Sequence, residues 1–71
     1  MVNIEVGRSY RLTREWEVRD EKTGTLKSYL LKGQILKVRR VASEEDHVWV
    51  EGVSHPLPLS ALRRGVAPVV A

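Results

Sequence analysis

Lys32-Gly33-Gln34-Ile35-Leu36-Lys37-Val38 is the stretch that decides the fold, together with His47-Val48-Trp49-Val50-Glu51-Gly52 and Leu57-Pro58-Leu59-Ser60-Ala61-Leu62. The first is typical of a tight turn followed by a strand, and the second of a strand that ends at a glycine. In the third, a proline fixes φ at the start of a single helical turn. This order of short elements predicts a very small β-barrel.

The segments on either side are also predicted to be short strands. Residues 10–18 alternate between apolar and polar side chains, which indicates a half-buried strand. Residues 25–31 form a second strand, whose alternation fails at Tyr29-Leu30-Leu31 and indicates a bulge or burial on both sides. Further strands are expected at residues 35–41, 47–53 and 55–57, and turns at 20–24, 32–33 and 43–46.

No stretch has a helical period of useful length, so the sequence predicts an all-β chain. We expect a small barrel of five to six short strands with a single 3₁₀ turn at residues 58–62. The barrel is assigned to residues 1–65 and an apolar C-terminal tail to residues 66–71, which form a sixth strand or stay loose. Such a tail can pair with the sheet edge of a second copy, which would give a weak homodimer.

Length and composition restrict the class of protein. The 71 residues allow one domain, which buries only about 60% of the surface that its unfolded chain exposes. Cysteine is absent, so disulfides and thiolate zinc sites cannot stabilise it. No apolar run approaches the roughly 20 residues of a membrane span, and no secretory signal is visible at the start. We therefore expect a cytoplasmic protein with no membrane partner.

The three stretches quoted above, with the acidic Glu44-Glu45-Asp46 between the first two, resemble the second half of SH3-like barrels. In that family a glycine-containing diverging turn opens the third strand. A strand that carries a tryptophan follows an acidic loop, and a proline-led 3₁₀ turn precedes the last strand. The resemblance covers about half of the chain and implies the SH3-like barrel fold.

The resemblance also implies one binding surface. In the peptide-binding SH3 domains, two acidic loops and the tryptophan form a groove for proline-rich ligands that carry arginine. The matching residues for a protein partner are Trp49, Glu15, Glu17, Asp20, Glu21, Glu44, Glu45 and Asp46.

The chain departs from this family pattern in three places. Arg8-Ser9-Tyr10-Arg11-Leu12 stands where the family has Ala-Leu-Tyr-Asp-Tyr. Trp49 is single rather than paired, and Ala61 or Leu62 replaces the usual tyrosine of the 3₁₀ turn. These departures argue against recognition of a proline motif.

The two tryptophans are predicted to differ in burial. Val48 and Val50 share one face of their strand and should point inward, so Trp49 should point outward. An outward indole offers a partner a large anchor, and the competing interpretation is that it packs under a loop or against Tyr29. Trp16 lies on the apolar face of its strand and is expected in the core.

The basic residues support nucleic acid as an alternative partner. Twelve Lys and Arg against nine Asp and Glu give a formal net charge of +3. Arginine suits phosphate because its planar guanidinium can donate two parallel hydrogen bonds to phosphate oxygens. If the first and third strands are neighbours, Arg11 and Arg39 share an outer face near Trp49. A solvated face with cross-strand ion pairs explains the same pattern. The candidate DNA- or RNA-binding residues are Arg11, Arg14, Lys37, Arg39, Arg40, Arg63 and Arg64.

Catalysis has little support in the sequence. His47 and His55 fit no metal-ligand spacing, and the serines lack the sequence context of a nucleophile. The end of the chain resembles that of type II plasmid dihydrofolate reductases, SH3-like chains that form a tetramer around one pore. The Val-Gln-Ile-Tyr run with which that family grips its substrate is absent here. We therefore expect a binding module without enzyme activity or cofactor, with a protein partner favoured over DNA or RNA.

Overall fold

The computed structural model describes residues 2–20 and 22–69, and these residues form a small all-β domain with one short helix. The predicted all-β class is therefore confirmed. A 3₁₀ turn, η1 (Ser43–Glu45), and a helix, α1 (Leu59–Gly65), accompany the strands. The strands are β1 (Ser9–Leu12), β2 (Trp16–Arg19), β3 (Leu26–Leu30), β4 (Ile35–Ala42), β5 (His47–Val50), β6 (Leu57–Pro58) and β7 (Val66–Pro68).

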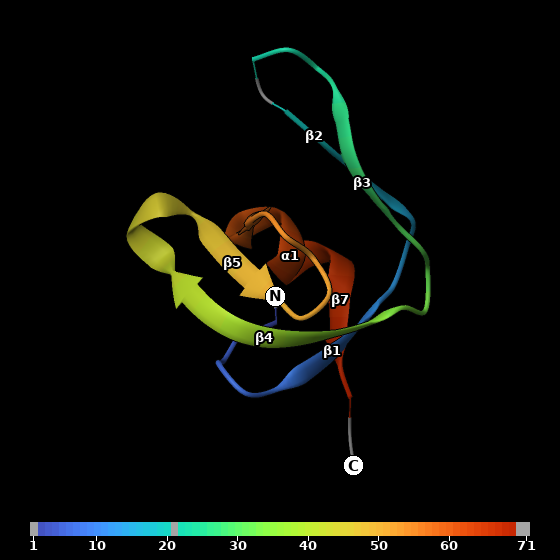
Figure 1. Ribbon diagram of the computed structural model, residues 1–71. Helices are drawn as coiled ribbons and strands as arrows, with labels where there is room; N and C mark the ends of the chain where they lie inside the picture. The colour runs from blue at the N-terminus through green and yellow to red at the C-terminus, as the bar shows by residue number, and fades with distance from the viewer. Residues whose placement is uncertain (1, 21, 70–71) are drawn as a thin grey trace.

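The strands form one curved sheet and one separate hairpin. The main sheet has the order β6-β5-β4-β1-β7, and all of its neighbouring strands are antiparallel. Strands β2 and β3 pair only with each other and extend away from the main sheet (Figure 1). The first and third strands expected from the sequence are neighbours, because β1 pairs with β4.

The core lies on the inner, concave side of the main sheet, where α1 also sits (Figure 1). Side chains alternate along the first half of β4, so that Leu36 and Val38 are buried while Lys37 between them is exposed. Trp16 is half-buried and packs against this core, as predicted. The buried side chains are Ile4, Tyr10, Leu12, Val18, Leu30, Leu36, Val38, Val48, Val50, Leu57, Leu59, Leu62 and Val66.

The prediction of one continuous strand over residues 10–18 is wrong. The chain bends at residues 13–15, so β1 belongs to the main sheet and β2 to the hairpin. The backbone N–H and the hydroxyl of Thr13 both donate to the carbonyl of Gly65, at 2.8 and 3.0 Å. These bonds at the end of α1 replace the ladder bonds that a continuous strand would make.

The irregularity expected at Tyr29-Leu30-Leu31 lies elsewhere. Leu30 is buried, while Tyr29 and Leu31 are 46% and 56% exposed, so the alternation of the strand holds at these residues. The register of the hairpin shifts instead between Val18 and Arg19, which leaves Lys27 as the extra residue. The hydrophobicity of Tyr29 and Leu31 was therefore a poor guide to their burial.

The helical turn predicted at residues 58–62 is present, but it is a seven-residue α-helix rather than a single 3₁₀ turn. Pro58 precedes it in an extended conformation, and Leu59 and Leu62 insert into the core. The helix has no capping side chain of its own at its N-terminus. The carboxylate of Asp46, which lies 14 positions from Ser60 in the chain, supplies the cap instead. Sequence spacing does not reveal this contact.

The apolar tail is a strand over its first part. β7 pairs with β1 through Leu12 and Val66, and Val66 is buried. The sixth-strand alternative is thus the one adopted by residues 66–68. Residues 70–71 of the predicted tail and Glu21 of the predicted acidic loop lie outside the described residues.

Candidate functional site

The outer face of the main sheet carries a group of exposed cations, which we call the basic face: Arg11, Lys37, Arg39 and Arg40. They reach this face because their strand neighbours point inward. Tyr10 and Leu12 flank Arg11 and are buried, and the same holds for Leu36 and Val38 around Lys37. The basic face therefore spans the two adjacent strands β1 and β4.

A β-bulge in β4 places two arginines side by side on this face. Val38 pairs with Val50 and Arg40 pairs with Trp49, so Arg39 is an extra residue in the ladder between β4 and β5. A bulge of this kind lets two successive side chains emerge on the same side of a sheet. Both Arg39 and Arg40 are exposed. Without the bulge, strict alternation would turn one of them inward.

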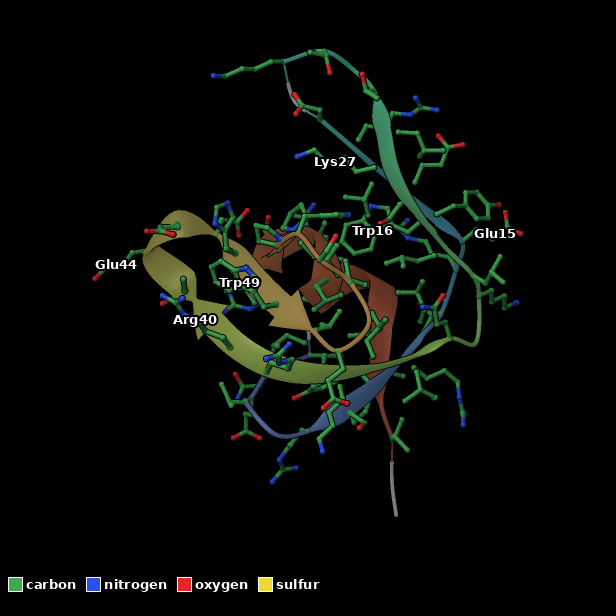
Figure 2. All side chains as sticks on the ribbon, in the orientation of Figure 1. Glu15, Trp16, Lys27, Arg40, Glu44 and Trp49 are labelled. Atoms are coloured by element: carbon green, nitrogen blue, oxygen red, sulfur yellow. The ribbon has the colours of Figure 1, made fainter. Side chains whose placement is uncertain are left out.

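Trp49 lies beside Arg40 on the neighbouring strand (Figure 2). The guanidinium carbon of Arg40 is 4.7 Å from the centroid of the indole ring, which is a cation–π contact. The imidazole of His47 meets the same indole edge-on, with ring centroids 5.6 Å apart. Trp49 is half-buried and does not belong to the core cluster, so the prediction that it points outward is confirmed.

A cleft of about 410 Å³, which we call the Trp49 cleft, opens next to this pair. The half-buried Val53 contributes apolar surface to it, and the exposed Ser54 contributes a hydroxyl, while the side chain of Val50 belongs to the core beneath. The cleft thus combines an aromatic wall, an apolar surface and two cationic side chains, and its lining residues are Arg39, Arg40, Trp49, Val50, Val53 and Ser54.

No acidic side chain within residues 2–20 and 22–69 forms an ion pair with the basic face. The ion pairs among these residues join Arg8 to Glu5, Arg19 to Glu17, Lys27 to Asp20, and His47 to Glu45. None of them includes a member of the basic face. Glu51 lies beside this face, since its backbone N–H donates to the carbonyl of Lys37, but it forms no ion pair with a described residue. The four cations of the face are therefore not paired with any described acid.

A second cleft, the hairpin cleft, lies between the hairpin and the strands β5 and β6 and measures about 420 Å³. Three of the residues predicted to bind a protein partner line it, namely Asp20, Glu45 and Asp46. Its charges are balanced, because Arg19, Lys22, Lys27 and two histidines also line it. Trp49 lines the other cleft, and its indole contacts His47, which lines this one.

Asp20 and Asp46 already serve the fold. One carboxylate oxygen of Asp20 accepts the backbone N–H groups of Lys22 and Thr23, at 2.8 and 3.2 Å. These bonds, chiefly that from Lys22, lower the pKa of Asp20 below its ordinary value. The carboxylate of Asp46 accepts the backbone N–H of Ser60 at 2.8 Å and its hydroxyl at 3.0 Å. Asp46 therefore caps α1 from 14 positions away in the chain.

The remaining acidic candidates lie on the hairpin and on η1. Glu15 accepts the hydroxyl of Tyr29 at 2.7 Å, and this bond raises the pKa of Tyr29 above its ordinary value. Glu17 accepts two hydrogen bonds from the guanidinium of Arg19. Glu44 is exposed on η1, far from the hairpin (Figure 2). The structure therefore disperses the acidic set instead of gathering it around Trp49.

The other basic candidates gather at the C-terminal end of α1. Arg63 and Arg64 occupy the last turn of the helix, where cations complement the helix dipole. The side chain of Arg14 approaches Gly65, with its Nε 3.7 Å from the place that a Cβ would occupy there. These three residues have a local electrostatic role and are separate from the basic face.

Sequence reasoning missed two further contacts. Val53 and Ser54 complete the Trp49 cleft, yet they follow Gly52 in an irregular segment for which no pattern predicts a direction. Ser28 and His55 are joined by a 2.7 Å hydrogen bond that ties the hairpin to the segment before β6. Nothing in the spacing of these two residues, 27 positions apart, predicts that contact.

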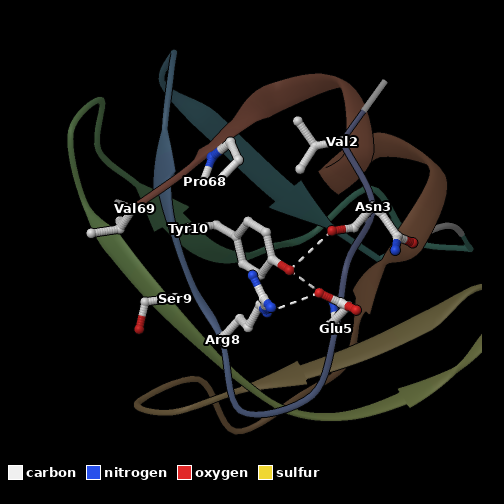
Figure 3. A pocket seen from close by; sticks show the side chains of 8 residues that line it. All are labelled: Val2, Asn3, Glu5, Arg8, Ser9, Tyr10, Pro68 and Val69. Atoms are coloured by element: carbon white, nitrogen blue, oxygen red, sulfur yellow. Dashed lines mark hydrogen bonds and ion pairs between the residues drawn. The ribbon is translucent and has the colours of Figure 1, made fainter. Parts of the chain in front are cut away.

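A further hollow of about 650 Å³ lies between the N-terminal segment and the end of β7 (Figure 3). Its polar groups bond to one another. The Tyr10 hydroxyl donates to the carbonyl of Asn3 and accepts the backbone N–H of Glu5, whose carboxylate pairs with Arg8. This network anchors the N-terminal segment to the sheet.

Two classes of feature are absent from the described part of the chain. Its residues include no group of three His, Asp or Glu side chains placed to hold a metal ion. It also contains no helix with the length and apolarity needed to cross a membrane.

Comparison with protein-family models, with curated proteins and with solved structures found no match to this chain.

Proposed function

We propose that the protein is a non-enzymatic binding module that holds a nucleic-acid strand on its basic face. The observation that carries the proposal is the set of four exposed cations on β1 and β4, none of them in an ion pair with a described acid, next to a half-exposed indole. We further propose a cytoplasmic location and membership of the SH3-like superfamily. The antiparallel strand order and the proline-led helix before the last strand support that membership.

The chemistry of the face suits a phosphate backbone. Arginine donates to phosphate oxygens through a planar fork, and lysine adds a point charge. A sequence-tolerant nucleic-acid site combines such cations with an aromatic platform on which a base stacks. Arg39, Arg40 and Trp49 supply both parts within a single cleft.

A protein partner in the hairpin cleft is the second candidate function. The observation that favours it is the meeting of Asp20, Glu45 and Asp46 in one cleft with Pro56 and Pro58. These acids could contact a basic, extended peptide. Two of the three are already committed to intramolecular hydrogen bonds, so the basic face has more unused binding capacity.

The test is fluorescence anisotropy of a labelled single-stranded oligonucleotide across a salt series. Four phosphate contacts on a single strand predict a slope of log K against log salt of about −3. The variant Arg39→Ala/Arg40→Ala should weaken binding and make the slope shallower by about 1.4. The matched control is Arg63→Ala/Arg64→Ala, which also removes two positive charges, but from the last turn of α1.

The two variants separate a site from a general charge effect. Binding that persists in the control and weakens in the β4 variant supports the proposal. Equal weakening in both variants, or no binding by the wild-type protein at low salt, would refute it. Capture of a basic peptide that is lost in Asp20→Ala/Glu45→Ala would favour the hairpin cleft instead.

A further inference from the structure

We infer that the Trp49 cleft takes one unpaired nucleobase, so that the protein prefers single-stranded to double-stranded nucleic acid. This inference rests on the proposed function and specifies its ligand. The cleft combines the indole of Trp49, apolar surface from the half-buried Val53, and the guanidinium groups of Arg39 and Arg40.

The size of the cleft fits one small flat group. Its volume of about 410 Å³ lies at the lower end of the range of small-molecule sites. Among the residues that line it, Trp49 alone is aromatic, so it offers one stacking surface. A strand that crosses the face can therefore place one base in it, while the neighbouring nucleotides stay on the surface of the sheet.

The chemistry of the lining matches the parts of a nucleotide. The indole and Val53 contact the face and edge of a base, and the hydroxyl of the exposed Ser54 can donate to or accept from its polar edge. Arg39 and Arg40 are exposed and border the same cleft, so they reach the phosphates on either side of the inserted base. A plain anion would use only the arginines and would leave the aromatic and apolar surface unexplained.

Before a ligand binds, the guanidinium of Arg40 lies over the face of the Trp49 indole on which a base would stack. An exposed cation–π contact is weaker than the stacking of a base on an aromatic ring, so a base can take the place of the guanidinium. The released guanidinium then pairs with a phosphate. A base inside a duplex is already stacked on both faces and cannot enter without unpairing, which gives the preference for single strands.

The test compares a single-stranded oligonucleotide with a hairpin duplex of the same composition at the same salt concentration. We expect the wild-type protein to bind the single strand about tenfold or more tightly than the duplex, in line with the stacking of one base. Trp49→Ala should bring the ratio of the single-strand affinity to the duplex affinity near one. It should leave the slope of log K against log salt unchanged, because the phosphate contacts remain. Trp49→Phe should keep most of the preference. Tyr29→Ala is the control, since this exposed aromatic residue lies on the hairpin.

Indole fluorescence gives a readout that does not depend on the folding of Trp49→Ala. Binding of the single strand should quench Trp49 emission in the wild-type protein, and this change should vanish in Trp49→Phe, which keeps Trp16 as the remaining indole. Equal affinity for single strand and duplex, or unchanged indole emission at saturation, would overturn the base-binding inference and leave the proposed function standing. Failure to bind either nucleic acid at low salt would overturn both.

Discussion

The capping of α1 by Asp46 yields a quantitative prediction. Its carboxylate accepts the backbone N–H and the hydroxyl of Ser60, and its carbonyl accepts the N–H of Leu59 at 3.0 Å. Asp46 is also the one non-glycine residue with positive φ, +58°, within the described chain. Replacement by alanine therefore removes a cap and places a Cβ without polar compensation in the left-handed region.

The two losses can be estimated separately. Loss of a capping carboxylate costs about 1 kcal/mol, and a left-handed alanine costs a further 1 kcal/mol or so. Asp46→Ala should thus destabilise the protein by about 2 kcal/mol, which in a domain of this size lowers Tm by about 8–16 °C. Asp46→Gly keeps only the first loss, about 1 kcal/mol, because glycine adopts positive φ freely. Asp46→Asn keeps an acceptor for Ser60 and tolerates this φ, so it should cost least.

The assay is urea unfolding followed by tryptophan fluorescence, with Glu44→Ala as the control. Glu44 is exposed in the same loop and forms no ion pair within the described residues, so its replacement should change stability by no more than about 0.5 kcal/mol. The expected order of stability is Asn, then Gly, then Ala. Equal stability of the Asn and Ala variants would refute the cap, and a Gly variant no better than Ala would refute the strain argument.

Three further predictions concern the core and two titrating groups. Leu36→Ala should lower the free energy of unfolding by about 2–5 kcal/mol, because Leu36 is 0% exposed. Ile35→Ala, at a 48% exposed position, should lower it far less. Urea unfolding measures both variants, and equal losses would contradict the assignment of the two faces of β4. The hydrogen bond to Glu15 raises the pKa of Tyr29 above 10.0, so its contribution to stability is present below pH 10.0 and is lost as pH rises through the folded pKa. Ring NMR shifts should show this pKa falling toward 10.0 in Glu15→Gln, and an unchanged titration would rule out the bond. The amide bonds from Lys22 and Thr23 lower the pKa of Asp20 below 3.8, so the turn is stabilised above about pH 3.8 and loosens as pH falls through the folded pKa. The amide shifts of both residues should follow that titration and should stay flat in Asp20→Asn.

The fold was predictable where side-chain alternation and turn residues agree. Leu36 and Val38 alternate with exposed lysine and arginine, and Gly33 with φ +88° marks the turn before them, so β4 was correctly placed. The prediction of a continuous strand fails between β1 and β2, where the alternation is interrupted at Arg14 and the chain bends. At this bend the N–H of Thr13 donates to the carbonyl of Gly65. The residues around Thr13 do not reveal that distant partner.

The candidate site was predictable in part. The outward direction of Trp49 followed from the burial of Val48 and Val50 on either side of it. The contact with Arg40 did not follow, because it depends on the bulge at Arg39, which shifts the register by one residue. The roles of the acidic residues were also hidden, since Asp46 looks like a solvent-exposed loop residue until Ser60 is placed beside it.

NMR shift mapping tests the central claim most directly, because it reports which surface meets the ligand. A ¹⁵N-labelled protein would be titrated with an unstructured single-stranded oligonucleotide at low salt. We predict the largest shifts at the indole N–H of Trp49 and at the amides around Arg39 and Arg40. Largest shifts around Asp20 and Glu45 in the hairpin cleft, or at the last turn of α1, would contradict the account.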